Sequence, residues 1–284
     1  KVAETCKEEV LSDENFIFLN VLVKEDFSII VVDKYDWLIC VISLFAKQIN
    51  LCDSCVLLLE NGMEKEAYLL ARSQFNNMLW IKYICDGVDN SRVQEYLYQP
   101  NVGQIKQSMN FKKILREFGE QLDEKFHEPS WLNKINKVIS ENKKILVEAN
   151  LSDLKIKQVT ELAMQDVTLF GMYVTMYNEG SKIEHSDISA VSTYRKKVVD
   201  EYSDSQIFSI DLSKSDKESW VYVFRNSLIC LFFSFESLWN RLNDREEHLF
   251  VKTSVAESIF DKGKLAKIML KFSVCQKMLD DYEK

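Results

Sequence analysis

Glycine and proline are scarce in this sequence of 284 residues. The chain holds only 7 Gly and 2 Pro, whereas average usage would give about 20 and about 14. Turn-rich β-sandwiches, glycine-rich nucleotide-binding loops and long disordered linkers all depend on these two residues. Their scarcity argues for a mostly helical protein, and the length is ample for a hydrophobic core.

Basic charge is also in short supply. The formal net charge is −8, and the sequence pI is about 5.2. Proteins that bind nucleic acid usually carry a basic excess or a basic stripe, but the densest basic clusters here are only Lys143-Lys144 and Arg195-Lys196-Lys197. We therefore expect no bulk DNA binding, while a small basic pocket for RNA or a nucleotide stays open.

The seven cysteines lack the partners that a metal site would need. Their number is odd and most lie in apolar runs, which predicts buried free thiols in a reducing compartment. Cys52 and Cys55 form a Cys-x-x-Cys, but a zinc site would need a second pair or histidines at ligand spacing. We expect two cysteines one helical turn apart, with no metal and no cofactor.

Long uncharged apolar runs are absent as well. Residues 27–45 come closest to a membrane span, but Asp33, Lys34 and Asp36 interrupt them. Neither a span of 18 uncharged apolar residues nor a secretory signal is visible. The expectation is a cytoplasmic protein without membrane contact.

Helical periodicity is the dominant signal that is present, and it predicts an all-α fold. A long helix is expected from Ser28 or Asp33 to Glu60, where Asn61-Gly62 provides a stop signal. A second helix should follow over 64–85. Two long helices joined by so short a turn must pack antiparallel. The predicted architecture is an irregular helical bundle built on this long antiparallel αα-hairpin.

The rest of the chain reads as part of one helical domain over residues 1–284. The polar region 91–150 is predicted as a helical insertion or subdomain, and the Ser/Asp-rich segment 200–216 as an exposed loop, in which the alternation of Ile207, Ser209 and Asp211 is compatible with a short strand. The further helices expected are 91–99 (stopped by Pro100), 104–125, 130–147, one ending at Met164, 166–184, 215–245 and 254–282.

Arg72 is a charged residue in an apolar helix, with Asn76 one turn further along the same face. A buried guanidinium needs a carboxylate or several acceptors. Glu236, inside the apolar run 231–239, is the expected partner. Arg72 then either forms a structural ion pair that holds helices together or binds an anion or phosphate.

A second polar feature is a stripe along the predicted helix 166–184. Tyr173, Tyr177, Ser181 and His185 recur at four-residue spacing and share one face. Histidine suits proton transfer near neutral pH, but a structural histidine fits too, and no third group completes a triad. Because buried polar groups are costly when isolated, we expect Arg72 and this stripe to converge on one polar centre.

These motifs resemble a large family of uncharacterised, all-helical bacterial proteins, a domain of unknown function. The resemblance rests on Glu66-Ala67 followed by Arg72-Ser73-Gln74-Phe75-Asn76, and on Tyr173-x3-Tyr177-x3-Ser181-x3-His185. It covers about 34–86 and 155–195, plus the helical tail. Asn76 stands where the family has Glu, so an acid expected at that place is missing.

The family in turn resembles HEPN-like helical proteins and abortive-infection proteins of phage defence, an analogy at the level of fold. Arg241 and His248 loosely fit the Arg-x(4–6)-His pattern of HEPN-type ribonucleases. Such a spacing arises readily by chance.

Two functions are therefore compatible with the sequence. The first is a helical interaction or scaffold module, of a bacterial phage-defence or toxin system, with a protein partner or a second copy and a buried polar network. The second is a HEPN-like effector that acts on RNA or a nucleotide. In that effector Arg72 would hold phosphate and His185 would serve as acid or base, and the binding residues would be Asn76, Tyr173, Tyr177, Ser181 and Glu236.

Overall fold

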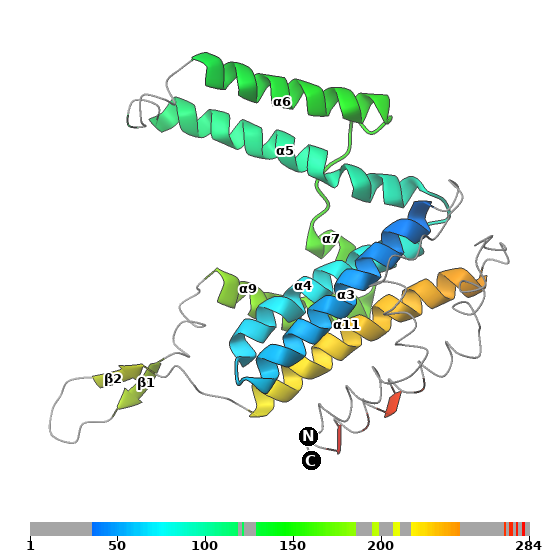
Figure 1. The fold of residues 1–284 in the computed structure, drawn as a ribbon, viewed down its shortest axis with the longest axis vertical. Coiled ribbons are helices and arrows are strands. Elements are labelled where there is room, and N and C mark those ends of the chain that lie inside the picture. The colour runs from blue at the N-terminus through cyan, green and yellow to red at the C-terminus, as the bar shows by residue number, and fades with distance from the viewer. Residues whose placement is uncertain are drawn as a thin grey trace. The chain divides into compact units, whose positions relative to one another are not determined.

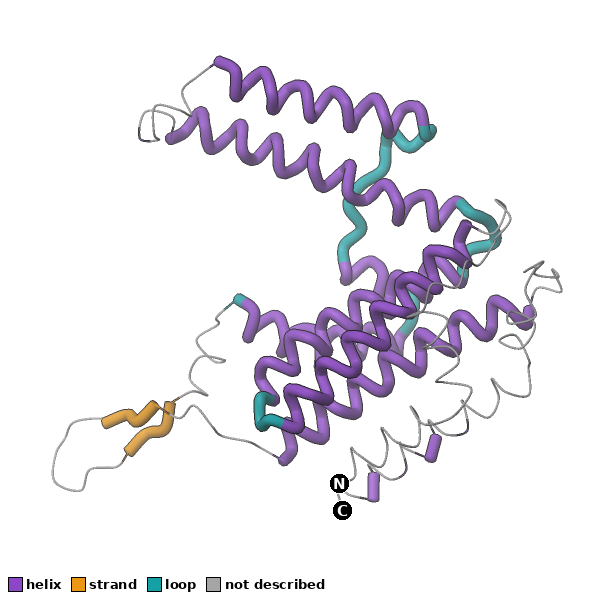
Figure 2. The backbone as a smooth tube through the Cα atoms, viewed as in Figure 1, coloured by secondary structure: helices purple, strands orange, loops and turns teal. Residues whose placement is uncertain are grey.

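The computed structural model describes residues 36–118, 121, 129–185, 195–198, 207–210 and 217–244, and positions 270, 273, 274, 277, 280 and 281. The predicted all-α class is confirmed, with one short β-hairpin among the described elements (Figures 1 and 2). The chain divides into two compact units, Lys1–Asp86 with Val159–Lys284, and Gly87–Gln158. The predicted polar insertion 91–150 falls inside the second unit.

Three long helices form the core of the first unit: α3 (Asp36–Glu60), α4 (Glu64–Cys85) and α11 (Lys217–Asp244). The turn between α3 and α4 contains Gly62 with φ of 68°, a left-handed conformation that glycine adopts without strain. Further along the two helices, Asn77 Nδ2 donates to the carbonyl of Leu44 at 2.7 Å. The two helices therefore run antiparallel.

Helix α11 packs along both partners. Near its start, Trp220 Nε1 donates to the carbonyl of Leu59 at 3.2 Å. Near its end, Arg241 donates to the carbonyl of Ile84, and its guanidinium lies 3.7 Å from the centre of the Trp37 ring. Helix α11 therefore runs antiparallel to α3 and parallel to α4.

The core is apolar but contains several buried amides. Phe45 and Phe235 are fully buried and their rings lie 6.1 Å apart. Asn77 Nδ2 also donates to Gln48 Oε1 at 2.9 Å. Gln74 is fully buried, and neither polar atom of its side chain has a hydrogen-bond partner, which costs on the order of 1–3 kcal/mol for each unsatisfied group.

The predicted helix 166–184 is interrupted in the structure. It consists of α8 (Val167–Met172), the π-helical turn η4 (Tyr173–Tyr177) and α9 (Asn178–Glu184), preceded by the short α7 (Val159–Ala163). Asp166 caps α8, because its carboxylate accepts from the backbone N–H of Thr168 and Leu169. Single π-helical turns are frequently found at functional sites.

A two-stranded antiparallel sheet follows α9. Strand β1 (Arg195–Val198) pairs with β2 (Ile207–Ile210), and Arg195 lies opposite Ile210. The second strand lies in the segment predicted as an exposed loop, and the other residues of 200–216 lie outside the described ones. The six described positions between 270 and 281 are helical and fall in the predicted last helix.

The second unit contains two helices, α5 (Ser91–Phe118) and α6 (Pro129–Glu148). The prediction that Pro100 ends a helix is wrong, since α5 continues through it. Proline removes one backbone hydrogen bond and costs roughly 3 kcal/mol in a helix. Its neighbours offset this, because Asn101 donates to Asn142 of α6 at 2.8 Å and Gln99 accepts from the backbone N–H of Lys157 at 3.0 Å.

The core of the second unit is thin. Among its described residues, the buried apolar side chains are Val93, Ile135 and Leu146. Two helices that pack only on each other bury one stripe of side chains on each helix. Other apolar side chains of α5 and α6 therefore remain at the surface.

Two helices of the first unit are long and apolar enough, by length and composition, to cross a membrane. They are Trp37–Glu60 and Glu218–Arg241. In the apolar 18-residue stretch of each helix, 44% and 67% respectively is buried inside the protein. Core helices of soluble proteins pass the same test, so this is weak evidence for a membrane location.

Candidate functional site

Arg72 meets the polar stripe of η4 and α9. One terminal nitrogen of its guanidinium, Nη2, donates to the Tyr177 hydroxyl at 2.9 Å, and the guanidinium carbon lies 4.6 Å from the centre of the same ring. The other terminal nitrogen, Nη1, forms an ion pair with Glu184. Only 17% of the Arg72 side chain is exposed, so both partners bind it in a largely desolvated place.

The predicted partner of Arg72 is wrong: the carboxylate is Glu184, not Glu236. Helix α11 runs parallel to α4, with the ring of Tyr222 6.0 Å from that of Tyr68 and Arg241 bound at Ile84. In this register Glu236 stands roughly seven to ten residues beyond Arg72, or about 10–15 Å at 1.5 Å per residue.

Gly180 makes this contact between α4 and α9 close. A Cβ atom at this position would lie 2.9 Å from Cβ of Arg72 and 3.1 Å from the carbonyl oxygen of Tyr68. Glycine is unfavourable inside a helix, and that cost is the sequence signal that could have identified the site. The prediction did not include this residue.

The other stripe residues differ in their contacts. The Tyr173 ring stacks on Tyr177, with centroids 5.2 Å apart and an angle of 21°. His185 is exposed over 72% of its side chain, and its Nε2 lies 3.7 Å from Glu184 Oε2. Ser181 is half-buried, and its carbonyl accepts from the His185 backbone N–H at 3.0 Å.

Arg72, Tyr177, Glu184 and His185 therefore form one chain of contacts, which we call the Arg72 cluster. Arg72 and His185 are linked through the shared carboxylate of Glu184. Asn76 is half-buried one turn from Arg72, and among the described residues it makes no hydrogen bond to the cluster.

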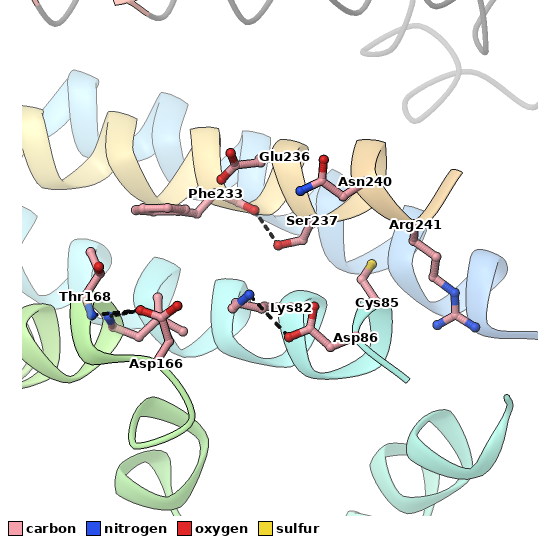
Figure 3. A pocket seen from close by; sticks show the side chains of 11 residues that line it. Lys82, Cys85, Asp86, Asp166, Thr168, Phe233, Glu236, Ser237, Asn240 and Arg241 are labelled. Carbon is pink, nitrogen blue, oxygen red and sulfur yellow. Dashed lines mark hydrogen bonds and ion pairs between the residues drawn. The ribbon is translucent and has the colours of Figure 1, made fainter. Parts of the chain in front are cut away.

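A separate polar pocket of about 500 Å³ lies at the other end of α4 (Figure 3). The end of α4 and the start of α8 form one side, and α11 forms the other. Apart from Glu236, the sequence reasoning did not identify it as a site. Its lining residues are Lys82, Cys85, Asp86, Asp166, Thr168, Leu169, Phe233, Glu236, Ser237, Asn240 and Arg241.

Several charges of this pocket already have partners. Lys82 Nζ lies 3.2 Å from Asp86 Oδ2. Desolvation alone would raise the pKa of Asp166, but hydrogen bonds from the backbone of Leu169 and Thr168 and the charge of Lys82 lower it overall. The Asp166 carboxylate therefore stays ionised at neutral pH.

Arg241 belongs to the Arg-x6-His pattern, yet it is 4% exposed and holds α11 against Trp37 and Ile84. His248 lies outside the described residues. The contacts of this arginine are those of a core residue.

The described cysteines are not in disulfides; they are Cys40, Cys52, Cys55, Cys85 and Cys230, while Cys6 and Cys275 lie outside the described residues. Burial raises the pKa of Cys55 to about 12 and that of Cys230 well above its usual value, with Cys52 adding to both shifts. Thiols protonated at neutral pH are poor nucleophiles and poor metal ligands. In the described part of the chain, no three His, Cys, Asp or Glu side chains are placed to hold a metal ion.

A family of unknown function (DUF5677) matches residues 38–202. The chain belongs to this family. The expected resemblance to an uncharacterised family is thereby confirmed. Comparison with curated proteins finds no match, and neither does comparison with solved structures.

The two polar sites differ in their relation to the DUF5677 match. The whole Arg72 cluster lies inside the matched residues 38–202, as do α4, α5 and α6. Helix α11 follows the matched region. The pocket therefore combines residues of the DUF5677 region with residues outside it.

Proposed function

We propose that this DUF5677 protein is a non-enzymatic helical interaction module that docks a partner protein through the α5–α6 hairpin. The observation that carries the proposal is an apolar face that the hairpin leaves exposed. Phe111, Ile114 and Phe118 share one face of α5 at spacings of three and four residues.

Helix α6 extends this face. Trp131, Val138 and Ile145 recur every seven residues, so they follow one stripe of the helix. The Phe111 and Trp131 rings are in edge-on contact at 6.4 Å, which joins the two stripes. Ile114, Phe118, Val138 and Ile145 are each at least 37% exposed. Exposed apolar side chains gathered on one face mark an interaction site.

The charge of the hairpin defines the partner. In a chain with net charge −8, helices α5 and α6 carry nine Lys and Arg against four Asp and Glu. Two copies of this basic hairpin would repel each other. An acidic amphipathic surface of another protein would match both the apolar face and the surrounding charge.

The Arg72 cluster has a structural role in this proposal. Both terminal nitrogens of Arg72 are engaged, one by Tyr177 and one by Glu184. A phosphate would have to displace Glu184 to reach them. The cluster thus holds α9 against α4. This structural role favours the scaffold function over catalysis.

Affinity capture from cells that make the protein tests the docking surface. Ile114→Glu with Ile145→Glu should lose most of the captured partner, because two charges enter the apolar face. Asn133→Glu with Ser140→Glu adds the same two negative charges at exposed positions of α6 outside the stripe, keeps every lysine of the hairpin, and should capture the partner as the wild type does. Equal capture of the same proteins by the wild type and the Ile114/Ile145 variant would overturn the proposal.

A second function has one specific observation in its favour. His185 is exposed and lies 3.7 Å from a carboxylate that also binds Arg72, and a histidine–carboxylate pair can move protons at neutral pH. A HEPN-like effector would then cleave RNA or a nucleotide at this surface. Incubating the purified protein with labelled RNA tests this second function. Cleavage by the wild type that is lost in His185→Ala would support the effector, and absence of cleavage would argue against it.

The cellular setting is part of the proposal. Buried thiols that form no disulfide, such as Cys55 and Cys230, support a reducing compartment such as the cytoplasm. A place in a bacterial phage-defence or toxin system is supported by the resemblance to abortive-infection proteins. The partner captured through the α5–α6 face would identify the system.

A further inference from the structure

We infer that the pocket between α4, α8 and α11 is a binding site for a small organic cation of the aliphatic polyamine class. The pocket lies in the first unit and is independent of the docking face on the α5–α6 hairpin. Its volume of about 500 Å³ is in the range of small-molecule sites.

The charge that remains uncommitted in the pocket is negative. Lys82 is paired with Asp86, and Arg241 is almost completely buried against Trp37. Glu236 is half-buried, and among the described residues it makes no hydrogen bond and no ion pair. A ligand that brings positive charge would compensate this carboxylate.

A second carboxylate faces the same cavity from the opposite side. Asp166 stands at the start of α8, whereas Glu236 is on α11 (Figure 3). The Oδ1 atom of Asp166 accepts both capping hydrogen bonds, and the Thr168 side chain donates a further one to this carboxylate. A carboxylate has about four lone-pair sites, so it can still accept from a ligand ammonium. Two carboxylates on opposite walls suit a molecule with ammonium groups at both ends of a flexible chain.

The uncharged lining suits the same ligand. Phe233 and Leu169 provide apolar contact for methylene groups, and an aromatic face also attracts an ammonium. The Asn240 amide and the Thr168 hydroxyl are exposed at the pocket and can accept further N–H groups.

A metal ion and an anion fit the pocket less well. No group of three His, Cys, Asp or Glu side chains in the described ranges is close enough to hold one metal ion. An anion would face Glu236 and Asp166 without a free cation to bind it. The cavity therefore selects charge that is positive and spread over an organic chain.

Calorimetric titration of the full chain with spermidine and with putrescine tests the site. We expect saturable binding, with a melting temperature that rises with ligand concentration. Glu236→Gln should weaken binding by about tenfold or more, because it removes a charge-assisted hydrogen bond. Asn240→Lys, at an exposed position, should block binding by placing a competing ammonium in the pocket.

The control is Glu218→Gln, which removes an exposed acidic residue at the opposite end of the same helix. It should bind both amines as the wild type does. Absence of saturable binding by either amine would overturn the inference, as would equal binding by Glu236→Gln and the wild type. An equal rise in melting temperature with MgCl₂ or NaCl at the same ionic strength would also overturn it.

Discussion

Gly180 offers a sharp test of how tightly α9 packs on α4. Alanine normally stabilises a helix interior relative to glycine by about 0.5–1 kcal/mol. At position 180, however, the added Cβ would lie 2.9 Å from Cβ of Arg72 and 3.1 Å from the backbone of Tyr68. These atoms belong to the body of α4 and cannot rotate away, and overpacking of this kind costs about 1–3 kcal/mol. We expect Gly180→Ala to lower the free energy of unfolding by about 0.5–2 kcal/mol.

Gly171→Ala provides the matched control. Gly171 lies in α8, one residue from the π-helical turn, and a Cβ there would meet no atom within 4 Å. This variant should be as stable as the wild type, or more stable by up to about 1 kcal/mol. Urea denaturation followed by circular dichroism measures both. If Gly180→Ala unfolds at the same urea concentration as Gly171→Ala, the close packing of α9 on α4 is refuted.

Three further substitutions test the polar groups of the first unit. Arg72→Ala should cost about 1–2 kcal/mol in a urea melt, less than the loss of a fully buried pair, because Glu184 is 44% exposed and regains water; no loss would show that the ion pair does not hold α9. Gln74→Met should raise the melting temperature, since it removes two buried polar atoms without partners, and a drop would mean that these atoms are satisfied. Because its folded pKa is lowered, Asp166 should stabilise the fold above its unfolded pKa of about 3.9 and lose this contribution as the pH falls through the folded value. Asp166→Asn, which still caps α8, should therefore flatten the acid side of a stability–pH profile, and an unchanged profile would contradict the assignment.

Local signals predicted much of the fold. Asn61-Gly62 ends α3 where the sequence suggests, because Gly62 takes the left-handed conformation that favours glycine at a helix end. Helix α4 likewise ends at the predicted Cys85. The predicted helix 215–245 corresponds to α11 at Lys217–Asp244. Each signal depends on residues within a few positions of one another.

Features that depend on tertiary contacts were not predictable in this way. Periodicity shows that Glu236 lies in an apolar helix, but it does not give the register of α11 against α4, which keeps Glu236 away from Arg72. Nor does it give the packing of α9 on α4, which brings Glu184 to Arg72. Pro100 remains in a helix because residues distant in sequence hold its neighbours. The π-helical turn at Tyr173–Tyr177 likewise carries no sequence signal that we recognise.

The candidate site was predicted in part. The convergence of Arg72 with Tyr177 could be expected, because polar groups on apolar helices are cheapest when they satisfy one another. The pocket could not be predicted, since its lining residues come from three helices. About half of these residues belong to α11, so the pocket depends on how α11 packs.

Site-specific photo-cross-linking tests the central proposal of a docking face most directly. A photoreactive residue would replace Ile114 or Ile145 on the apolar face of the α5–α6 hairpin, or the exposed Asn133 or Ser140 outside that face as controls, in cells that make the protein. The proposal predicts a cross-linked acidic protein at 114 and 145 and little or none at 133 and 140. Equal cross-linking at all four positions, or none at 114 and 145, would contradict it.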